Sequence, residues 1–394
     1  MPTRPCWVEV RTRILEDNFR FLETLAAPHA DLLAIVKADS YGHALELCAP
    51  AAVRAGAQWL GVTSVEEGAA ARMLCPTARI LVIGGVFPAQ GAAVVENRLT
   101  VVAWEQWQLD ELEVAAQAAG LGPESLPVHL EVDTGMSRQG ASPRGLDPVL
   151  GRFKPASPLK LEAVMTHLFA ADEANGRVTG EQLRELDEVL GRVSGAGHFA
   201  EWLNVGNSAA LLAGQAPVIG ELAARHGMKA MLRPGLALYG LVPEFEPPFE
   251  DEPASLAAAR ANLKPVLTWK SRVVGVRAVP TGTVVGYNGT FVATEPMRLA
   301  LVAAGYADGL DRRLGNRFHL LVNGERAPLV GRVSMDQSVI DVTEIPAVKA
   351  GDEVVLIGTQ GGETITAVDH AKVAGTISWE IFTQIGPRVP RIGD

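Results

Sequence analysis

The sequence has no excess of positive charge, few cysteines and no long apolar segment, and each shortage excludes a class of protein. The net charge of −10 and pI of about 5.4 argue against nucleic acid or an anionic membrane as the main partner. The cysteines Cys6, Cys48 and Cys75 lack metal-ligand spacing and cannot all pair, so we expect a reducing cytoplasm and no metal site. No apolar run reaches about 18 residues, and the amino terminus is interrupted by Arg and Glu, so we expect neither export nor a membrane span.

The composition itself is that of a large globular protein. Of the 394 residues, 48% are hydrophobic and 20% charged, and the 40 glycines and 25 prolines supply many turns. A chain of this length exceeds one ordinary core, which predicts two domains.

Short apolar runs alternate with helix-patterned segments through about residue 240, the pattern that builds parallel sheets from βα units. Eight such runs lie at 32–37, 58–63, 79–84, 99–103, 127–132, 161–166, 201–206 and 231–239. Eight strands with intervening helices predict a TIM-type (β/α)8 barrel, whose active site lies at the carboxyl ends of the strands. A doubly wound open sheet is the alternative.

The composition changes after the last of these runs. Residues 241–262 hold several prolines and a cluster of acids, which indicates a linker. Later segments are β-branched runs broken by Gly, Pro and Asn, and the pair Asn323–Gly324 predicts a hairpin. We expect a barrel domain at 1–245 and a mostly β domain at 246–394, with the first strand, CWVEVRT, able to pair with either.

One lysine, Lys37, follows the apolar run of residues 32–36 into the polar turn KADSYGHA. Burial lowers the pKa of a lysine, which makes its amine a nucleophile for Schiff-base formation with a carbonyl substrate or pyridoxal phosphate (PLP). Taken alone, the segment is better explained by an ordinary solvated lysine after a strand.

Further polar residues follow other apolar runs, where side chains from different barrel strands can converge on Lys37. Arg138 could bind a carboxylate bidentately, and His167 stands at a strand end. Asn207 and Ser208 precede a helix-like run, which indicates an N-cap and also an anion site. Arg233 precedes Pro234 and a glycine that lets backbone amides approach a ligand. Surface arginines, a core histidine and a plain cap are the structural alternatives.

The full set of motifs resembles the alanine racemase family. The matching segments, in chain order, are KADSYGHA, DTGMSRQG, MTHLFAAD, NSAALL, RPGLALYG, VVGYNG, GYADGL, VGRVSMDQ and IGPRVPR. The resemblance implies a PLP-binding barrel followed by a β domain, in a cytoplasmic homodimer with shared active sites. It also implies that the protein interconverts L- and D-alanine with two bases and so supplies D-alanine for peptidoglycan.

The resemblance assigns roles position by position. Lys37 and Tyr287 would be the catalytic bases, on opposite faces of the cofactor. The cofactor-binding residues would be Lys37, Tyr41, His167, Asn207, Ser208, Arg233, Gly235, Leu236 and Trp379. The substrate-binding residues would be Arg138, Tyr306, Met335 and Asp336, of which the last three come from the other subunit.

These residue types suit racemisation for physical reasons. The Cα proton leaves on one face and a proton returns on the other, so two bases must flank a planar carbanion. An arginine facing the pyridine nitrogen keeps its proton, which withholds the fully protonated electron sink and suppresses transamination.

The chain departs from the family pattern at two informative positions. Glu131 stands where many members have a carbamylated lysine, and we expect it to supply the negative charge unmodified and to pair with Arg138. Trp379 replaces a tyrosine whose hydroxyl helps to fix the phosphate, which puts substrate breadth in question. A racemase of broader specificity, a related decarboxylase and a non-catalytic PLP carrier are the alternative functions.

Overall fold

The computed structural model describes residues 4–394, and the chain divides into two compact units. The barrel unit comprises Arg13–Ser40 and Cys48–Pro265. The second unit comprises the chain up to Thr12, Tyr41–Leu47 and Val266–Asp394. The expected order, a barrel followed by a mostly β domain, is confirmed.

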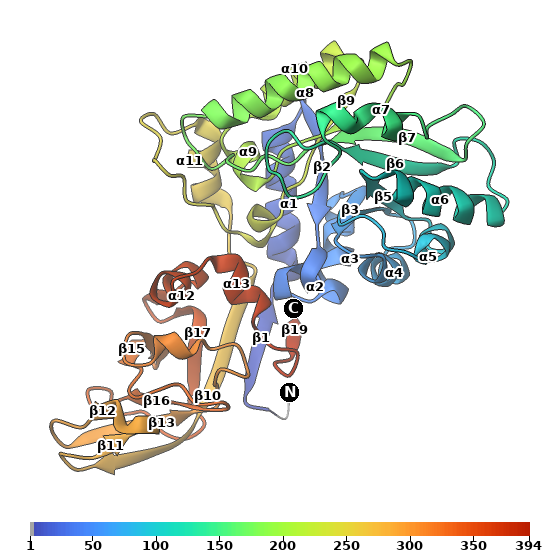
Figure 1. The fold of residues 1–394 in the computed structure, drawn as a ribbon. Coiled ribbons are helices and arrows are strands. Elements are labelled where there is room, and N and C mark those ends of the chain that lie inside the picture. Colours follow the sequence, from blue (N-terminus) through green and yellow to red (C-terminus); the bar gives the residue numbers. More distant parts are fainter. Residues whose placement is uncertain (1–3) are drawn as a thin grey trace. The chain divides into compact units, whose positions relative to one another are not determined.

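Eight parallel strands close the barrel, each paired with the next and the last with the first (Figure 1). They are β2 Ala30–Ile35, β3 Trp59–Val62, β4 Arg79–Val82, β5 Thr100–Ala103, β6 Leu126–Glu131, β7 Leu159–Met165, β8 Trp202–Asn204 and β9 Lys229–Leu232. Each overlaps one predicted run, so the open-sheet alternative is excluded. Strands of a closed barrel are covered on both faces, which is why they appear in the sequence as continuous apolar runs.

The strands of this unit alternate with helices along the chain. The helices are α1 Thr12–Ala26, α2 Lys37–Gly42, α3 Leu45–Ala55, α4 Val65–Leu74, α5 Gly91–Glu96, α6 Gln106–Ala118, α7 Leu146–Leu150, α8 Arg177–Gly195, α9 Ser208–Leu212, α10 Ala216–Arg225 and α11 Ala254–Asn262, with 3-10 turns η1 Pro143–Gly145 and η2 Leu236–Tyr239.

Two boundaries differ from expectation. The last predicted run extends too far, because β9 ends at Leu232, just before the Arg233–Pro234 pair. A residue before proline is restricted and a proline cannot donate to a strand ladder, so the chain leaves the sheet there. The expected linker is also partly helical, since α11 occupies residues 254–262 and buries Leu256 and Ala259.

The second unit is built on a nine-stranded sheet. Its strands are β1 Cys6–Val10, β10 Leu267–Val279, β13 Met297–Val302, β14 His319–Val322, β15 Glu325–Pro328, β16 Ser338–Asp341, β17 Glu353–Gln360, β18 Glu363–Ile365 and β19 Arg391–Gly393. A separate ribbon pairs β11 Val284–Val285 with β12 Phe291–Val292, and the helical elements are η3 Tyr287–Gly289, η4 Arg312–Leu314, α12 Ala367–Ala374 and α13 Ser378–Thr383.

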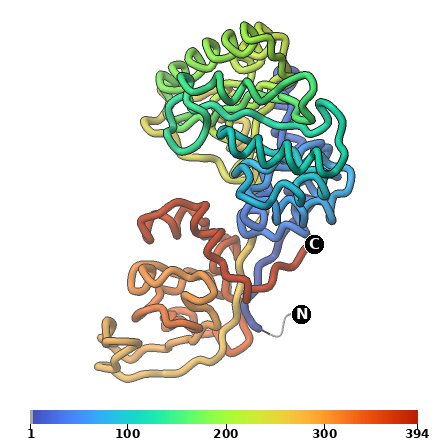
Figure 2. The backbone as a smooth tube through the Cα atoms, turned by 45° about the vertical axis from the view of Figure 1, so that its right-hand side comes forward, coloured from blue at the N-terminus to red at the C-terminus, as the bar shows by residue number. Residues whose placement is uncertain are grey.

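The first strand belongs to this sheet. β1 pairs antiparallel with β10 and parallel with β19, so the two ends of the chain lie side by side (Figure 2). The hairpin predicted at Asn323–Gly324 is confirmed, because Val322 pairs with Glu325 across two residues with φ of 53° and 83°.

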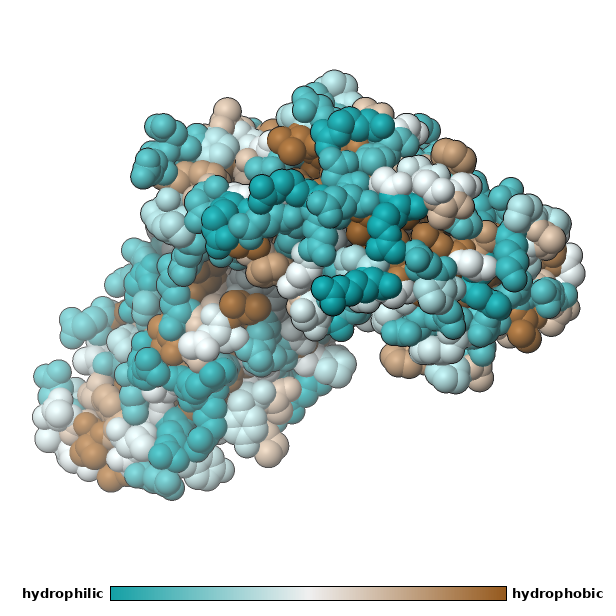
Figure 3. Space-filling view, turned by 45° about the horizontal axis from the view of Figure 1, so that its top comes forward, coloured by the Kyte–Doolittle hydropathy of each residue, from teal (hydrophilic) through white to brown (hydrophobic). Residues whose placement is uncertain are grey.

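On the face seen in Figure 3, hydrophilic residues predominate and apolar ones form separate small groups. No helix within residues 4–394 is long and apolar enough to cross a membrane. In the same range, no cluster of three or more His, Cys, Asp or Glu side chains is suited to a metal ion.

Candidate active site

The turn that carries Lys37 has an uncommon backbone. After Val36, whose amide donates to Gly61 O, residues 38–41 have φ between 51° and 56° and Gly42 has φ of 77°. Helix α2 is therefore a left-handed turn, which costs L-residues free energy and persists only where surrounding contacts hold it. Glu67 does so, because its carboxylate accepts from Ala38 N and Thr63 N, both at 2.7 Å.

The environment of Lys37 lowers the pKa of its amine. Burial is the main cause, and the cations Arg138 and Arg233 act in the same direction, whereas Glu67 opposes them. Within the described residues the Lys37 Nζ has neither a hydrogen bond nor an ion pair. An amine in this state is available both as a nucleophile and as a base.

Arg233 is buried and its orientation is fixed by the protein. Nη1 donates to the carbonyl and to the side-chain oxygen of Asn204, at 2.8 and 2.6 Å, and Nη2 donates to Thr166 O at 3.0 Å and to His167 Nδ1 at 3.2 Å. Only Nε–H, of the five donors, has no partner in the described part of the chain. Burial lowers the pKa of Arg233 to about 10, with Glu131 opposing the shift, so the guanidinium keeps its charge near neutral pH.

The hydrogen bond from Arg233 Nη2 also determines which ring nitrogen of His167 carries the proton. Because an arginine only donates, Nδ1 accepts and the proton lies on Nε2. Burial, then the charges of Arg233, Arg138 and Lys37, lower the pKa of His167 to about 3, so its ring is neutral at physiological pH.

Two loops meet at Ser208. Asn207 caps α9 by accepting from Ala210 N at 3.0 Å, as the sequence predicts. The Ser208 hydroxyl oxygen accepts from Gly235 N at 3.0 Å and from Ala237 N at 3.2 Å. The neighbouring amide of Leu236 has no partner among the described residues, so this corner can offer a hydrogen-bond donor to an anion.

The expected pairing of Glu131 with Arg138 is wrong. Glu131 Oε2 accepts from Gln139 Nε2 at 2.5 Å, and Gln139 also donates to Ile83 O at 3.1 Å. Arg138 is exposed and forms no ion pair within residues 4–394. Burial raises the pKa of Glu131, against the opposing effects of Gln139, Arg233 and Arg138.

Four candidate residues lie in the second unit, Tyr287 on η3 and the other three on or beside one turn. Tyr306 N donates to Ser334 O at 3.0 Å, which places Tyr306 beside the loop that carries Met335 and Asp336. Asp336 pairs with Arg388 at 2.7 Å. Tyr287 is 67% exposed, Met335 52% and Tyr306 42%, so these side chains face outward from their own unit.

Tyr41 and Trp379 also belong to the second unit. Helix α13, which carries Trp379, packs against the 41–47 segment through the ring contact of His43 with Phe382, whose centroids are 5.0 Å apart. Burial raises the pKa of Tyr41 to about 12, so its hydroxyl stays protonated and able to donate. Trp379 itself is half-buried.

The barrel unit thus gathers the predicted Lys37, Arg138, His167, Asn207, Ser208, Arg233, Gly235 and Leu236 in the loops that follow β2, β6, β7, β8 and β9. Sequence reasoning missed Glu67, Gln139 and Asn204, which hold those residues. Asn204 had a signal, since a polar side chain ends an apolar run there. Glu67 and Gln139 had none, because nothing in the sequence indicates which amide a side chain will reach.

Two family models match nearly the whole chain. "Alanine racemase, N-terminal domain" matches residues 10–243, and "Alanine racemase, C-terminal domain" matches residues 266–393. An alanine racemase of Halothermothrix orenii is 37% identical over 99% of this chain and 97% of its own length. That of Symbiobacterium thermophilum is 39% identical over 98% and 97%.

Solved structures of alanine racemases are similar to this chain over its whole length. The alanine racemase of Bacillus anthracis with bound L-Ala-P superposes with a TM-score of 0.87 at 32% identity, covering 100% of this chain and 96% of that one. The alanine racemase of Bartonella henselae with covalently bound pyridoxal phosphate gives 0.83 at 26% identity and covers both chains completely.

Proposed function

Because the chain belongs to the alanine racemase family, we propose that Lys37 and Tyr287 are the two bases with which it moves the Cα proton of alanine. The enzyme interconverts L-alanine and D-alanine and depends on pyridoxal phosphate. D-alanine for peptidoglycan is the use we propose for its product, and the cytoplasm its compartment. The observation that carries the residue assignment is the lone, electrostatically perturbed amine of Lys37 at the end of β2.

The charges at the carboxyl end of the barrel fit an anionic cofactor. Arg138 and Arg233 both lower the pKa of Lys37 and of His167, so the three cations repel one another in the absence of an anion. A phosphate would relieve that repulsion and bind the free amide of Leu236 and the hydroxyl of Ser208. Bound PLP supplies a conjugated ring that withdraws electrons from the substrate Cα and makes its proton acidic.

The residues around the proposed position of the cofactor ring would then have separate roles. Lys37 Nζ would bind the cofactor and exchange the Cα proton of the substrate on one face. The remaining donor, Arg233 Nε–H, would hold the pyridine nitrogen and keep its proton, because the pKa of Arg233 is about 10. The neutral ring of His167, held by Arg233, would support the cofactor ring, and Arg138 would bind a carboxylate.

The second base comes from the second unit, and we propose that it acts across a homodimer. Tyr287 is exposed on η3, in the same unit as Tyr306, Met335 and Asp336. Exposed aromatic and methionine side chains are enriched at protein interfaces. In such a dimer these side chains would complete the site of the other subunit and exclude water from it.

The first experiment incubates the protein and PLP with L-alanine in D2O, following optical rotation and Cα deuterium by NMR. Loss of rotation with deuterium at Cα, and without pyruvate, supports a two-base racemase. No exchange at all contradicts the proposal and indicates another substrate or a cofactor carrier.

Substitution of the second base separates an enzyme from a carrier. Tyr287→Phe should retain the absorbance of bound PLP and lose racemisation by several hundred-fold, on the order expected for a general base. Racemisation at the wild-type rate would exclude Tyr287 as a base. Other amino acids, tested in the same way, measure the substrate breadth that Trp379 allows.

A further inference from the structure

A row of polar side chains, buried except at its far end, runs through the barrel behind Arg233. It passes from Arg233 to Asn204 at the end of β8, to His129 in β6, to Glu162 in β7 and to Arg79 at the start of β4. The three middle residues are at most 3% exposed. Barrel interiors are normally filled by branched apolar side chains, and burying polar groups there costs free energy.

Each contact in the row has one permitted direction. Arg233 Nη1 donates to Asn204 Oδ1 at 2.6 Å, so the Asn204 amide nitrogen faces His129 Nδ1, 3.1 Å away, and donates to it. His129 therefore carries its proton on Nε2, which faces Glu162 Oε2 at 3.4 Å. Glu162 Oε1 in turn accepts from Arg79 Nη2 at 2.5 Å.

The protonation states agree with that direction. Burial lowers the pKa of His129, although Glu162 opposes the shift, so the ring is neutral near pH 7. Burial would raise the pKa of Glu162, but His129 and Arg79 outweigh it and the pKa is lowered. A neutral imidazole with a fixed tautomer thus lies between a carboxylate and an amide.

The junction of His129 and Glu162 is the loosest contact in the row. The 3.4 Å separation is long for a hydrogen bond, and neither buried atom has another partner among the described residues. Its geometry therefore depends on Arg79, which pairs with Glu162 and lies over the Trp59 ring at 3.8 Å.

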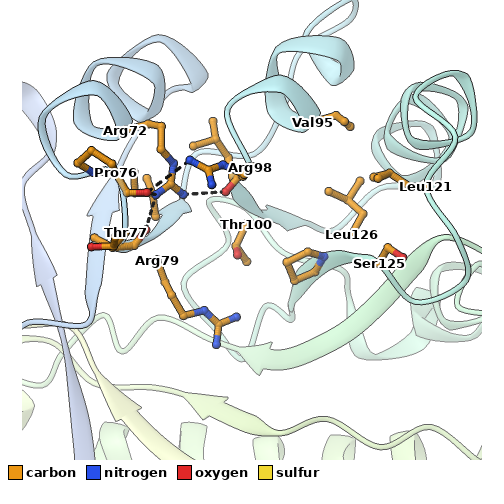
Figure 4. A pocket seen from close by; sticks show the side chains of 14 residues that line it. Arg72, Pro76, Thr77, Arg79, Val95, Arg98, Thr100, Leu121, Ser125 and Leu126 are labelled. Carbon is orange, nitrogen blue, oxygen red and sulfur yellow. Dashed lines mark hydrogen bonds between the residues drawn. The ribbon is translucent and has the colours of Figure 1, made fainter.

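Arg79 lies at the other end of the barrel from Lys37. It lines a pocket at the amino ends of β4, β5 and β6, and its guanidinium points away from those of Arg72 and Arg98 (Figure 4). Arg72 donates to backbone carbonyls, including Ala78 O and Arg98 O, whereas Arg79 donates to the carboxylate of Glu162. The row therefore connects this pocket wall to the cofactor arginine.

We propose that His129 and Glu162 are positioning residues, which through Asn204 fix the direction of the Arg233 Nε–H toward the cofactor ring. The proposal rests on the function proposed above. With Glu162 neutralised, His129 loses the carboxylate that favours its Nε2–H tautomer, so the ring can present Nδ1–H to Asn204 and force the Asn204 amide to rotate. Its NH2 group would then oppose the guanidinium, donor against donor, and Arg233 would shift.

The test compares Glu162→Gln with a matched control. Asp187 accepts from Arg225 at 2.7 Å and from His226 at 2.6 Å, which repeats the Arg–carboxylate–His arrangement on the surface. PLP is titrated into cofactor-free protein, and the absorbance of the bound form is followed against pH. Glu162→Gln should weaken PLP binding roughly tenfold and displace the absorbance titration by roughly half a pH unit or more. Asp187→Asn should change neither.

A second pair of variants separates positioning from stability. His129→Gln can still accept from Asn204 and donate to Glu162, whereas His129→Leu can do neither. We expect the glutamine variant to restore most of the PLP affinity and the pH titration that the leucine variant loses. Thermal unfolding identifies any variant that does not fold, and Arg79→Gln, altered at the half-exposed end, then replaces it with a smaller shift expected.

The outcomes distinguish the two proposals. Wild-type affinity and titration in both Glu162→Gln and His129→Leu would overturn the positioning role alone. Absence of PLP binding or racemisation in the wild type would instead overturn the proposed function.

Discussion

Glu131 is a buried carboxylate whose charge the fold disfavours. Because its pKa is raised, protonated Glu131 stabilises the fold at low pH, and that contribution is lost as the pH rises through the folded pKa. Glu131→Gln keeps the acceptor for Gln139 and removes the titration. We therefore expect the variant to gain stability relative to wild type at pH 8, and to gain less at pH 4.5.

Urea unfolding at the two pH values checks this expectation. A variant that loses stability at pH 8 would show that the attraction of Arg233 and Arg138 outweighs burial.

For single residues, the sequence indicates the chemical role of a side chain better than it indicates the hydrogen-bond partner of that side chain. Lys37 and Arg233 were candidates because each cation directly follows an apolar run. The hydrogen-bond partner of Glu131 could not be predicted, because Arg138 and Gln139 are adjacent in sequence and only the loop geometry decides which of them reaches Glu131. Asp133 shapes that loop by accepting from Gly135 N and Ser137 N, and Ser137 takes φ of 56° there.

Helix α12 is held to β17 by a buried histidine. His370 Nε2 donates to Leu356 O at 2.7 Å, and burial lowers the pKa of His370 from 6.5 to about 4. Its contribution to stability is therefore complete above pH 6.5 and is lost as the pH falls toward 4. We expect the second unit to lose up to about 3 kcal/mol over that range.

His370→Gln tests the origin of that loss, since glutamine can donate to Leu356 O without titrating. Denaturation at pH 7 and 4.5 should show a smaller pH dependence in this variant than in wild type or in His29→Gln, which changes an exposed histidine. An undiminished dependence would assign the acid sensitivity to other groups.

The left-handed turn of α2 depends on a glycine at its end. Gly42 has φ of 77°, and a Cβ there would lie 2.3 Å from Phe382 O. Gly42→Ala should destabilise the protein by about 2–4 kcal/mol and weaken PLP binding through the adjacent Tyr41. Gly191→Ala, in the interior of α8 with open space around it, should instead stabilise by about 0.5–1 kcal/mol, as thermal unfolding would show. Equal effects at the two sites would refute this account of the turn.

The same turn marks the limit of prediction for elements. The eight barrel strands were predictable because burial on both faces leaves continuous apolar runs. The left-handed turn was not, since Ala38, Asp39, Ser40 and Tyr41 have no preference for positive φ as a group. Contacts from Glu67 and Phe382, distant in sequence, impose it.

In the whole molecule, each unit is assembled from segments that are not contiguous in the sequence. The second unit takes its sheet from both chain ends and adds the 41–47 segment, which directly follows α2's first residues. The sequence left the partner of β1 undecided. Strands pair through backbone hydrogen bonds, and the side chains do not specify which strand provides them. The chain passes from the barrel unit to the second unit within α2, between Ser40 and Tyr41.

The shared-site dimer makes a quantitative prediction for mixed subunits. Lys37→Ala and Tyr287→Phe should each be inactive alone. If every site takes Lys37 from one subunit and Tyr287 from the other, a mixed dimer retains one site with both bases. Equal mixing with free exchange makes half of the dimers mixed, so about one quarter of wild-type activity should return. Activity should return only after the dimers are dissociated and allowed to exchange subunits, and variants mixed without prior dissociation are the control. That result supports the shared site. No recovery from mixed dimers verified by mass would place both bases in one chain, because each subunit would then still lack one of them.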